Sequence, residues 1–205
     1  MPTAPSPYRG QIPRWLENLG TEPPGPGVLE GPAQLRRLLA EGSPLLYRIL
    51  EKLPEKIYLG IKRHPLPSSG RRVFGYTTPP QRAWPAEISL DPDYIRLATE
   101  GMKRQTITHE GLHALRFLRP RQGQGRFGWW PQPTSSRILS TAQRTTRFPP
   151  GYVDLLTDRM GSGHGALDII AHELARRGGT PILPRTAPVY DAVEKAMHHI
   201  RRAQP

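Results

Sequence analysis

Residues 106–115 read TITHEGLHAL, and the interpretation of the whole chain starts from this stretch. It carries His109 and His113 four positions apart, with Glu110 directly after the first histidine. Residues four apart on a helix project from the same face, about one turn from each other. Apart from these three residues the stretch is uncharged, as a helix buried in a core requires. The stretch therefore predicts a buried helix with two imidazoles side by side.

The arrangement matches the HExxH pattern of zinc sites. Two imidazoles one turn apart can bind a single zinc ion, and a glutamate beside the first ligand can reach a water on that ion. Zinc lowers the pKa of its bound water to about 7, and the carboxylate takes the proton as the water attacks a carbonyl group. We therefore expect Zn²⁺ as cofactor, His109 and His113 as ligands, and Glu110 as general base. A histidine pair packed in the core without metal is the alternative.

A zinc site of this kind needs a third protein ligand. The chain has no cysteine, so the ligand must be a histidine or a carboxylate. Residues 161–177, GSGHGALDIIAHELARR, offer His164, Asp168 and His172 at helical spacing. Successive helical turns are about 5.4 Å apart, so one ion can take only one of the three. His64, in the segment KRHPLP, is expected to be a loop residue.

The composition and net charge of the chain limit how it can be organised and what it can bind. Its 205 residues suit one domain, and a Pro/Gly-rich N-terminal arm is expected over 1–31, with the domain over 32–205. The net charge of +12 suggests an acidic partner or nucleic acid besides a protein or peptide substrate. Basic residues are scattered along the chain rather than massed in one block.

No apolar run of about 18 residues and no signal peptide is visible, so the expectation is a cytoplasmic protein without a membrane partner, or one exported by a route the sequence does not show.

Apolar periodicity and turn residues predict the order of the secondary structure elements. Strands are expected at 57–62, 73–77 and 86–91. Helices are expected over 33–53 with a break at 42–44, from 92, over 99–118, over 164–177 and over 189–203. The predicted fold class is α+β, a single domain with a small mixed sheet packed on the helix that carries TITHEGLHAL and a helical C-terminal part.

Two helices, TITHEGLHAL and ALDIIAHELAR (166–176), resemble the paired motifs of gluzincin-type zinc metallopeptidases. The likeness covers about residues 84–200 and is strongest to the compact group that includes the anthrax lethal factor catalytic domain and the Pro-Pro endopeptidases. It implies a zincin-like domain and a zinc-dependent endopeptidase, with Asp168 in register with the third ligand. The oxyanion-stabilising tyrosine of that group has no direct counterpart, which leaves Tyr152, His164 and His172 as candidates for the oxyanion or an outer position.

The segment GSGHG is similar to SprT-like proteases, which act on DNA-bound proteins and would select His164 as third ligand. A third possibility is a non-enzymatic basic binding module, in which four protein ligands hold a structural zinc ion. For an endopeptidase, we expect an extended substrate along an edge strand at 86–91, beside Ile88, Ser89 and Leu90. Trp129 and Trp130, in the segment FGWW, are further candidates for the substrate cleft.

Overall fold

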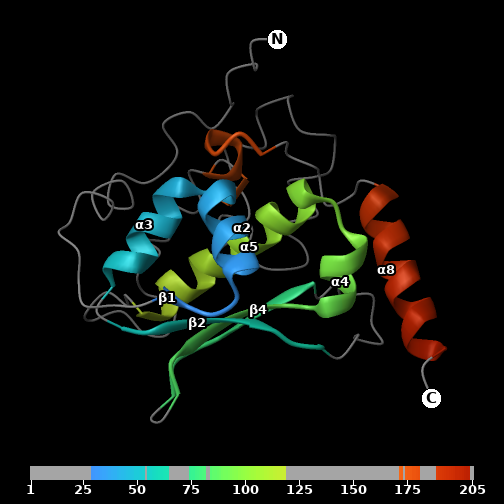
Figure 1. Cartoon of the computed structure of the whole chain (residues 1–205), viewed down its shortest axis with the longest axis horizontal. Coiled ribbons are helices and arrows are strands. Elements are labelled where there is room, and N and C mark those ends of the chain that lie inside the picture. Colours follow the sequence, from blue (N-terminus) through green and yellow to red (C-terminus); the bar gives the residue numbers. More distant parts are fainter. Residues whose placement is uncertain are drawn as a thin grey trace, which may run out of the picture.

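The computed structural model describes residues 29–53, 55–64, 74–81, 84–118, 171–180 except 173, and 188–203. They form a four-stranded sheet whose one face is covered by the helices α2, α3 and α5, while α4 and α8 lie beside one end of the sheet (Figure 1). The elements are β1 (Leu29–Glu30), α2 (Ala33–Gly42), α3 (Pro44–Lys52), β2 (Ile57–Ile61), β3 (Gly75–Thr78), β4 (Ala86–Leu90), α4 (Pro92–Leu97), α5 (Glu100–Leu118) and α8 (Pro188–Arg202). Residues 171–172 and 174–177 are also helical. The predicted mixture of helices with a small sheet is confirmed.

The sheet has the order β1-β2-β4-β3. β1, β2 and β4 run parallel, and β3 is antiparallel to β4, so the sheet is mixed as predicted. Leu29 and Glu30, expected within the N-terminal arm over 1–31, pair with Ile57 and Tyr58 and so belong to the sheet. The remainder of the expected arm, residues 1–28, lies outside the described residues.

The prediction of an edge strand at 86–91 was also wrong. β4 lies between β2 and β3, and Ile88, Ser89 and Leu90 are at most 2 % exposed. A strand paired on both sides keeps no main-chain groups to bind a substrate. In the described part of the chain, β3 is the strand that ends the sheet on this side.

Local turn chemistry fixes the starts of two helices. The Ser43 hydroxyl accepts a hydrogen bond from the Leu46 amide at 3.2 Å, and Pro44 occupies the first turn of α3. The Asp91 carboxylate accepts from the Asp93 amide at 2.9 Å and so caps α4. Both helices therefore begin where the sequence predicts them.

Helix α5 lies at the centre of the fold, packed against the sheet on one side and against α2 and α3 on the other. Gly111 makes the second contact possible, because a Cβ there would lie 3.0 Å from Leu46 Cδ2 and 3.4 Å from Leu50 Cδ1. The buried side chains of α5 include Ile107, Leu112 and Leu115. Because α5 packs against other elements on two sides, its rotation about the helix axis is fixed.

A second apolar cluster joins the start of β3 to α4, α5 and α8. Phe74 stacks on Tyr94 with ring centroids 4.6 Å apart and on Tyr190 at 5.9 Å. Among the residues described, no helix is long and apolar enough to span a lipid bilayer.

Candidate metal and catalytic site

His109 and His113 lie side by side in the middle of α5. Their Nε2 atoms are 3.1 Å apart, and the rings meet edge to face with centroids 4.8 Å apart. His109 is buried and His113 is half-buried. The helical spacing expected from TITHEGLHAL therefore brings the two ring nitrogens together.

The separation of these nitrogens fits a shared zinc ion. Tetrahedral zinc with Zn–N bonds of about 2.0–2.1 Å places two imidazole nitrogens roughly 3.3 Å apart. The 3.1 Å separation lies within a few tenths of an ångström of that value. Neutral imidazoles are also ordinary zinc ligands. The pair therefore supplies two donors of suitable chemistry and spacing.

Glu110 is buried on the side of α5 that faces β3. The Thr77 hydroxyl lies 2.6 Å from Glu110 Oε2 and 2.9 Å from the main-chain oxygen of the same residue. Thr77 is itself buried and comes from the strand that ends the sheet. The carboxylate of Glu110 is thus held by the side chain of Thr77, a residue that no sequence pattern singled out.

His172, one of the three candidates for a third ligand, lies against the same helix one turn before the pair. Its Nε2 atom is 2.6 Å from Nε2 of Gln105, and both side chains are buried. The described residues contain no group of three or more potential ligands that could hold a metal, so His172 does not join His109 and His113 there. The other candidates, Asp168 and His164, lie outside the described residues, as do Tyr152, Trp129 and Trp130.

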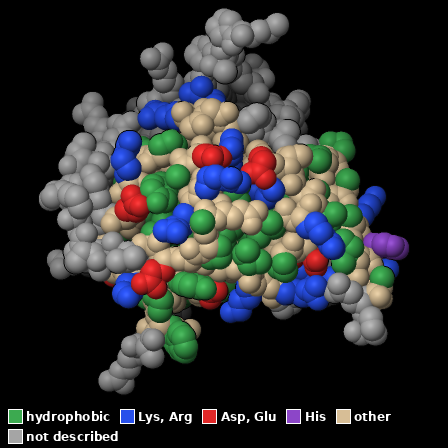
Figure 2. Space-filling view, in the orientation of Figure 1, with side chains coloured by type: hydrophobic (Ala, Val, Ile, Leu, Met, Phe, Trp, Pro, Cys, Tyr) green, Lys and Arg blue, Asp and Glu red, His purple; other side chains and the backbone are tan. Residues whose placement is uncertain are grey.

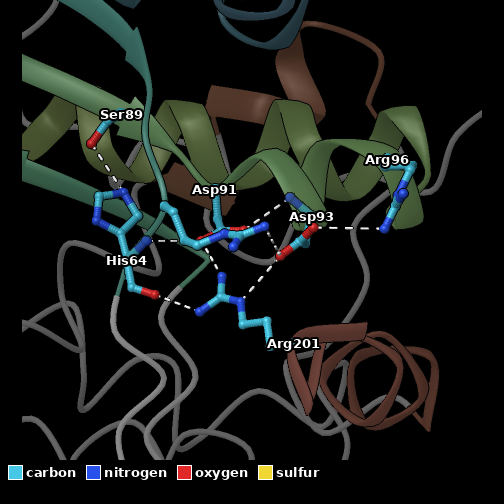
Figure 3. A network of polar contacts seen from close by, with 7 residues as sticks. His64, Ser89, Asp91, Asp93, Arg96 and Arg201 are labelled. Carbon is cyan, nitrogen blue, oxygen red and sulfur yellow. Dashed lines mark hydrogen bonds and ion pairs between the residues drawn. The ribbon is translucent and has the colours of Figure 1, made fainter. Parts of the chain in front are cut away.

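A second polar cluster closes the end of the sheet where β4 leads into α4 (Figure 3). Arg201 of α8 reaches three groups: its Nη2 pairs with the Asp91 carboxylate, its Nε lies 3.1 Å from Asp93 Oδ2, and its Nη1 donates to the His64 carbonyl oxygen at 2.5 Å. The Asp93 carboxylate also faces Arg63 and Arg96, each at 3.6 Å. These contacts connect residues that are far apart in the sequence.

His64 lies outside the helices and strands, as expected of a loop residue, and it is buried within this cluster. Its main-chain N–H donates to Asp91 Oδ2 at 2.9 Å, and its Nε2 lies 3.1 Å from the Ser89 hydroxyl. Burial lowers the pKa of the imidazole below its ordinary value, and this effect outweighs the attraction of Asp91 and Glu110, which acts in the opposite direction. No sequence motif marks this histidine, because its partners come from distant segments.

The surface over the helices mixes charges of both signs. Figure 2 shows Lys and Arg side chains interspersed with Asp and Glu on this face of the described residues. Glu41 pairs with both Arg37 and Arg104, and Lys103 pairs with Glu100. The described residues of this face therefore do not form a continuous basic surface of the kind that binds nucleic acid.

Comparison with known proteins returns no relative. No protein-family model matches the chain, and no curated protein or solved structure matches it.

Proposed function

We propose that the protein is a zinc-dependent endopeptidase. The observation that carries the proposal is the pair of imidazole nitrogens 3.1 Å apart on α5, together with Glu110, which follows His109 in the sequence and is buried. A pair of histidines that served only to pack the core would not need a buried carboxylate next to it, since burying a charge is costly.

The roles follow from the chemistry of the side chains. His109 and His113 would hold the ion through Nε2, and the resemblance to gluzincins adds Asp168 as third ligand, with His164 as the alternative. A bound zinc ion would supply an activated water and polarise the scissile carbonyl. Glu110 would accept the proton of the water on its carboxylate and deliver it to the leaving amine.

The substrate is proposed to lie along β3 rather than along residues 86–91. β3 ends the described sheet and runs beside the carboxylate of Glu110. An extended peptide could pair with its main chain as an added strand, which selects peptides by backbone hydrogen bonds. Such binding would bring a peptide bond close to the histidine pair.

The test compares Glu110→Gln with Glu100→Gln, which changes the other glutamate of α5 at an exposed position. Zinc is measured by elemental analysis, and cleavage of a mixed peptide library by mass spectrometry. We expect Glu110→Gln to keep about one zinc per chain and to lose cleavage by about 10²–10⁴-fold, the usual contribution of a general base. Glu100→Gln should behave as wild type.

Two results would overturn the proposal. Cleavage by Glu110→Gln at the wild-type rate would exclude this residue as the base. A wild-type protein that holds zinc with four protein ligands and cleaves no peptide would have a structural site instead.

A further inference from the structure

We propose that Thr77 is the positioning residue of the general base, so that the strand that ends the sheet sets the orientation of Glu110. This inference rests on the proposed endopeptidase function. Thr77 acts through Glu110, to which its hydroxyl is hydrogen-bonded.

The hydrogen bonds of Thr77 are directed at one residue. Its hydroxyl lies 2.6 Å from Glu110 Oε2 and 2.9 Å from the Glu110 main-chain oxygen. A hydroxyl has one hydrogen to donate, and an ionised carboxylate is the stronger of the two acceptors. Since Thr77 is 7 % exposed, water competes little for this bond.

The strand also restrains the stem of the glutamate. A Cβ at Gly75 would lie 3.0 Å from Glu110 Cγ, so the backbone of β3 packs directly against that carbon. Tyr76, the residue between Gly75 and Thr77, is 52 % exposed, which shows that the strand turns Thr77 inward and its neighbour outward. Glu110 is therefore restrained at Cγ by packing and at Oε2 by a hydrogen bond.

Orientation matters because a glutamate side chain has several freely rotating bonds that must be ordered for proton transfer. With Oε2 bound to Thr77, Oε1 is the oxygen that accepts the proton from the water. Loss of the hydroxyl leaves ligands and packing in place and frees the carboxylate to rotate away from the water. The expected defect lies in the chemical step rather than in substrate binding.

The first experiment measures kcat, KM and zinc content for three variants. Thr77→Val keeps the shape of the side chain and removes the hydroxyl, and Thr77→Ser restores it. Thr180→Val makes the same change at a second buried threonine, which lies outside β3 and α5. For Thr77→Val we expect a loss of about 10–100-fold in kcat, the fold-change that corresponds to a hydrogen bond to a charged group. KM and zinc content should stay at wild-type values, and Thr77→Ser and Thr180→Val should both retain most of kcat.

A second experiment needs no activity. The thermal midpoints of Thr77→Val, Glu110→Ala and the double variant form a double-mutant cycle, and we expect the double variant to lose less than the sum of the two single losses.

The outcomes separate the two proposals. A wild-type protein that cleaves no peptide overturns the endopeptidase, whatever the cycle shows. In an active protein, a wild-type kcat in Thr77→Val, a Thr77→Ser variant as impaired as Thr77→Val, or additive losses in the cycle would each overturn the role of Thr77.

Discussion

In the described part of the chain, two regions combine histidines with buried carboxylates, and they differ in what faces the carboxylate. In the middle of α5, His109 and His113 turn their ring nitrogens toward each other, and the carboxylate of Glu110 is held by a neutral hydroxyl. At the end of the sheet, Asp91 and Asp93 face the guanidinium of Arg201. There the histidine contributes its main chain as well as its ring.

The contrast is between the proposed cation site and a cluster whose carboxylates are already paired with the guanidinium of Arg201. Carboxylates paired with arginine are satisfied within the fold, and removing one partner leaves a buried charge uncompensated. The pair on α5 offers two nitrogen donors, and the carboxylate of Glu110, next to it in the sequence, accepts a hydrogen bond from a neutral hydroxyl. Under the proposed function the first region would hold a metal ion, whereas the second holds α8 against the sheet.

The largest expected effect comes from removing a histidine of the pair. His109→Ala should lower zinc affinity by more than the 10–100-fold that is typical for residues outside the ligand set. His199→Ala, at an exposed position of α8, is the matched control. Metal titration by competition with a chromophoric chelator measures both. If the double variant His109→Ala/His113→Ala bound zinc with wild-type affinity, the histidine pair would not be the zinc site, and the proposed difference between the two regions would be wrong.

The second prediction concerns Asp91. Asp91→Asn keeps the shape of the side chain but removes the charge that faces Arg201, and breaking a buried pair costs about 3 kcal/mol. We expect the free energy of unfolding in urea to fall by about this amount while zinc content stays at one ion per chain. Glu55→Gln, at an exposed position, should change neither. Loss of zinc from folded Asp91→Asn would show that the two regions are coupled.

The third prediction distinguishes the candidates for the third ligand. If Asp168 binds the ion, Asp168→Ala should weaken zinc binding more than His164→Ala, whose effect should stay within about 10–100-fold. The same chelator competition compares the two variants. The reverse order would favour the SprT-like assignment of His164, and single-stranded DNA binding with a steep salt dependence would then be expected.

The smallest effect is a pH dependence of stability from His64. Its pKa is lowered in the folded state, so the unfolded chain binds the proton first as the pH falls. Stability should decrease from about pH 7 through the ordinary histidine pKa of about 6.5, and the loss should end below the lowered folded value. His64→Gln should flatten this part of the curve, measured as urea midpoints between pH 5 and 8. An unchanged slope would mean that other groups produce it.

Local patterns predicted much of the fold. The break at 42–44 follows from Ser43 and Pro44, and the start of α4 follows from the Asp91 cap, since these signals act within one helical turn. The order of strands could not be predicted in the same way, because β4 inserts between β2 and β3 through pairing that the alternation of residues does not encode. β1, with two residues, is too short to show any period.

In the candidate site, too, the contacts within one helix could be predicted from the sequence and the contacts between distant segments could not. The spacing of His109 and His113 within one helix suffices to bring their nitrogens together, and the pattern names Glu110 as well. Thr77 was missed because it comes from a strand more than thirty residues earlier, and only its inward position in the alternation VFGYT could have marked it. His64 was missed because Ser89, Asp91 and Arg201 are neighbours in space alone.

The close contact at Gly111 carries an evolutionary consequence. A methyl group at this position would press on Leu46 Cδ2 and approach Leu50 Cδ1, so an alanine requires the Leu46 side chain to shift by a few tenths of an ångström. Homologous chains should therefore vary in a correlated manner, with a larger residue at position 111 accompanied by a smaller one at position 46. The size of the residue at position 111 would then indicate how closely α3 approaches α5 in each lineage.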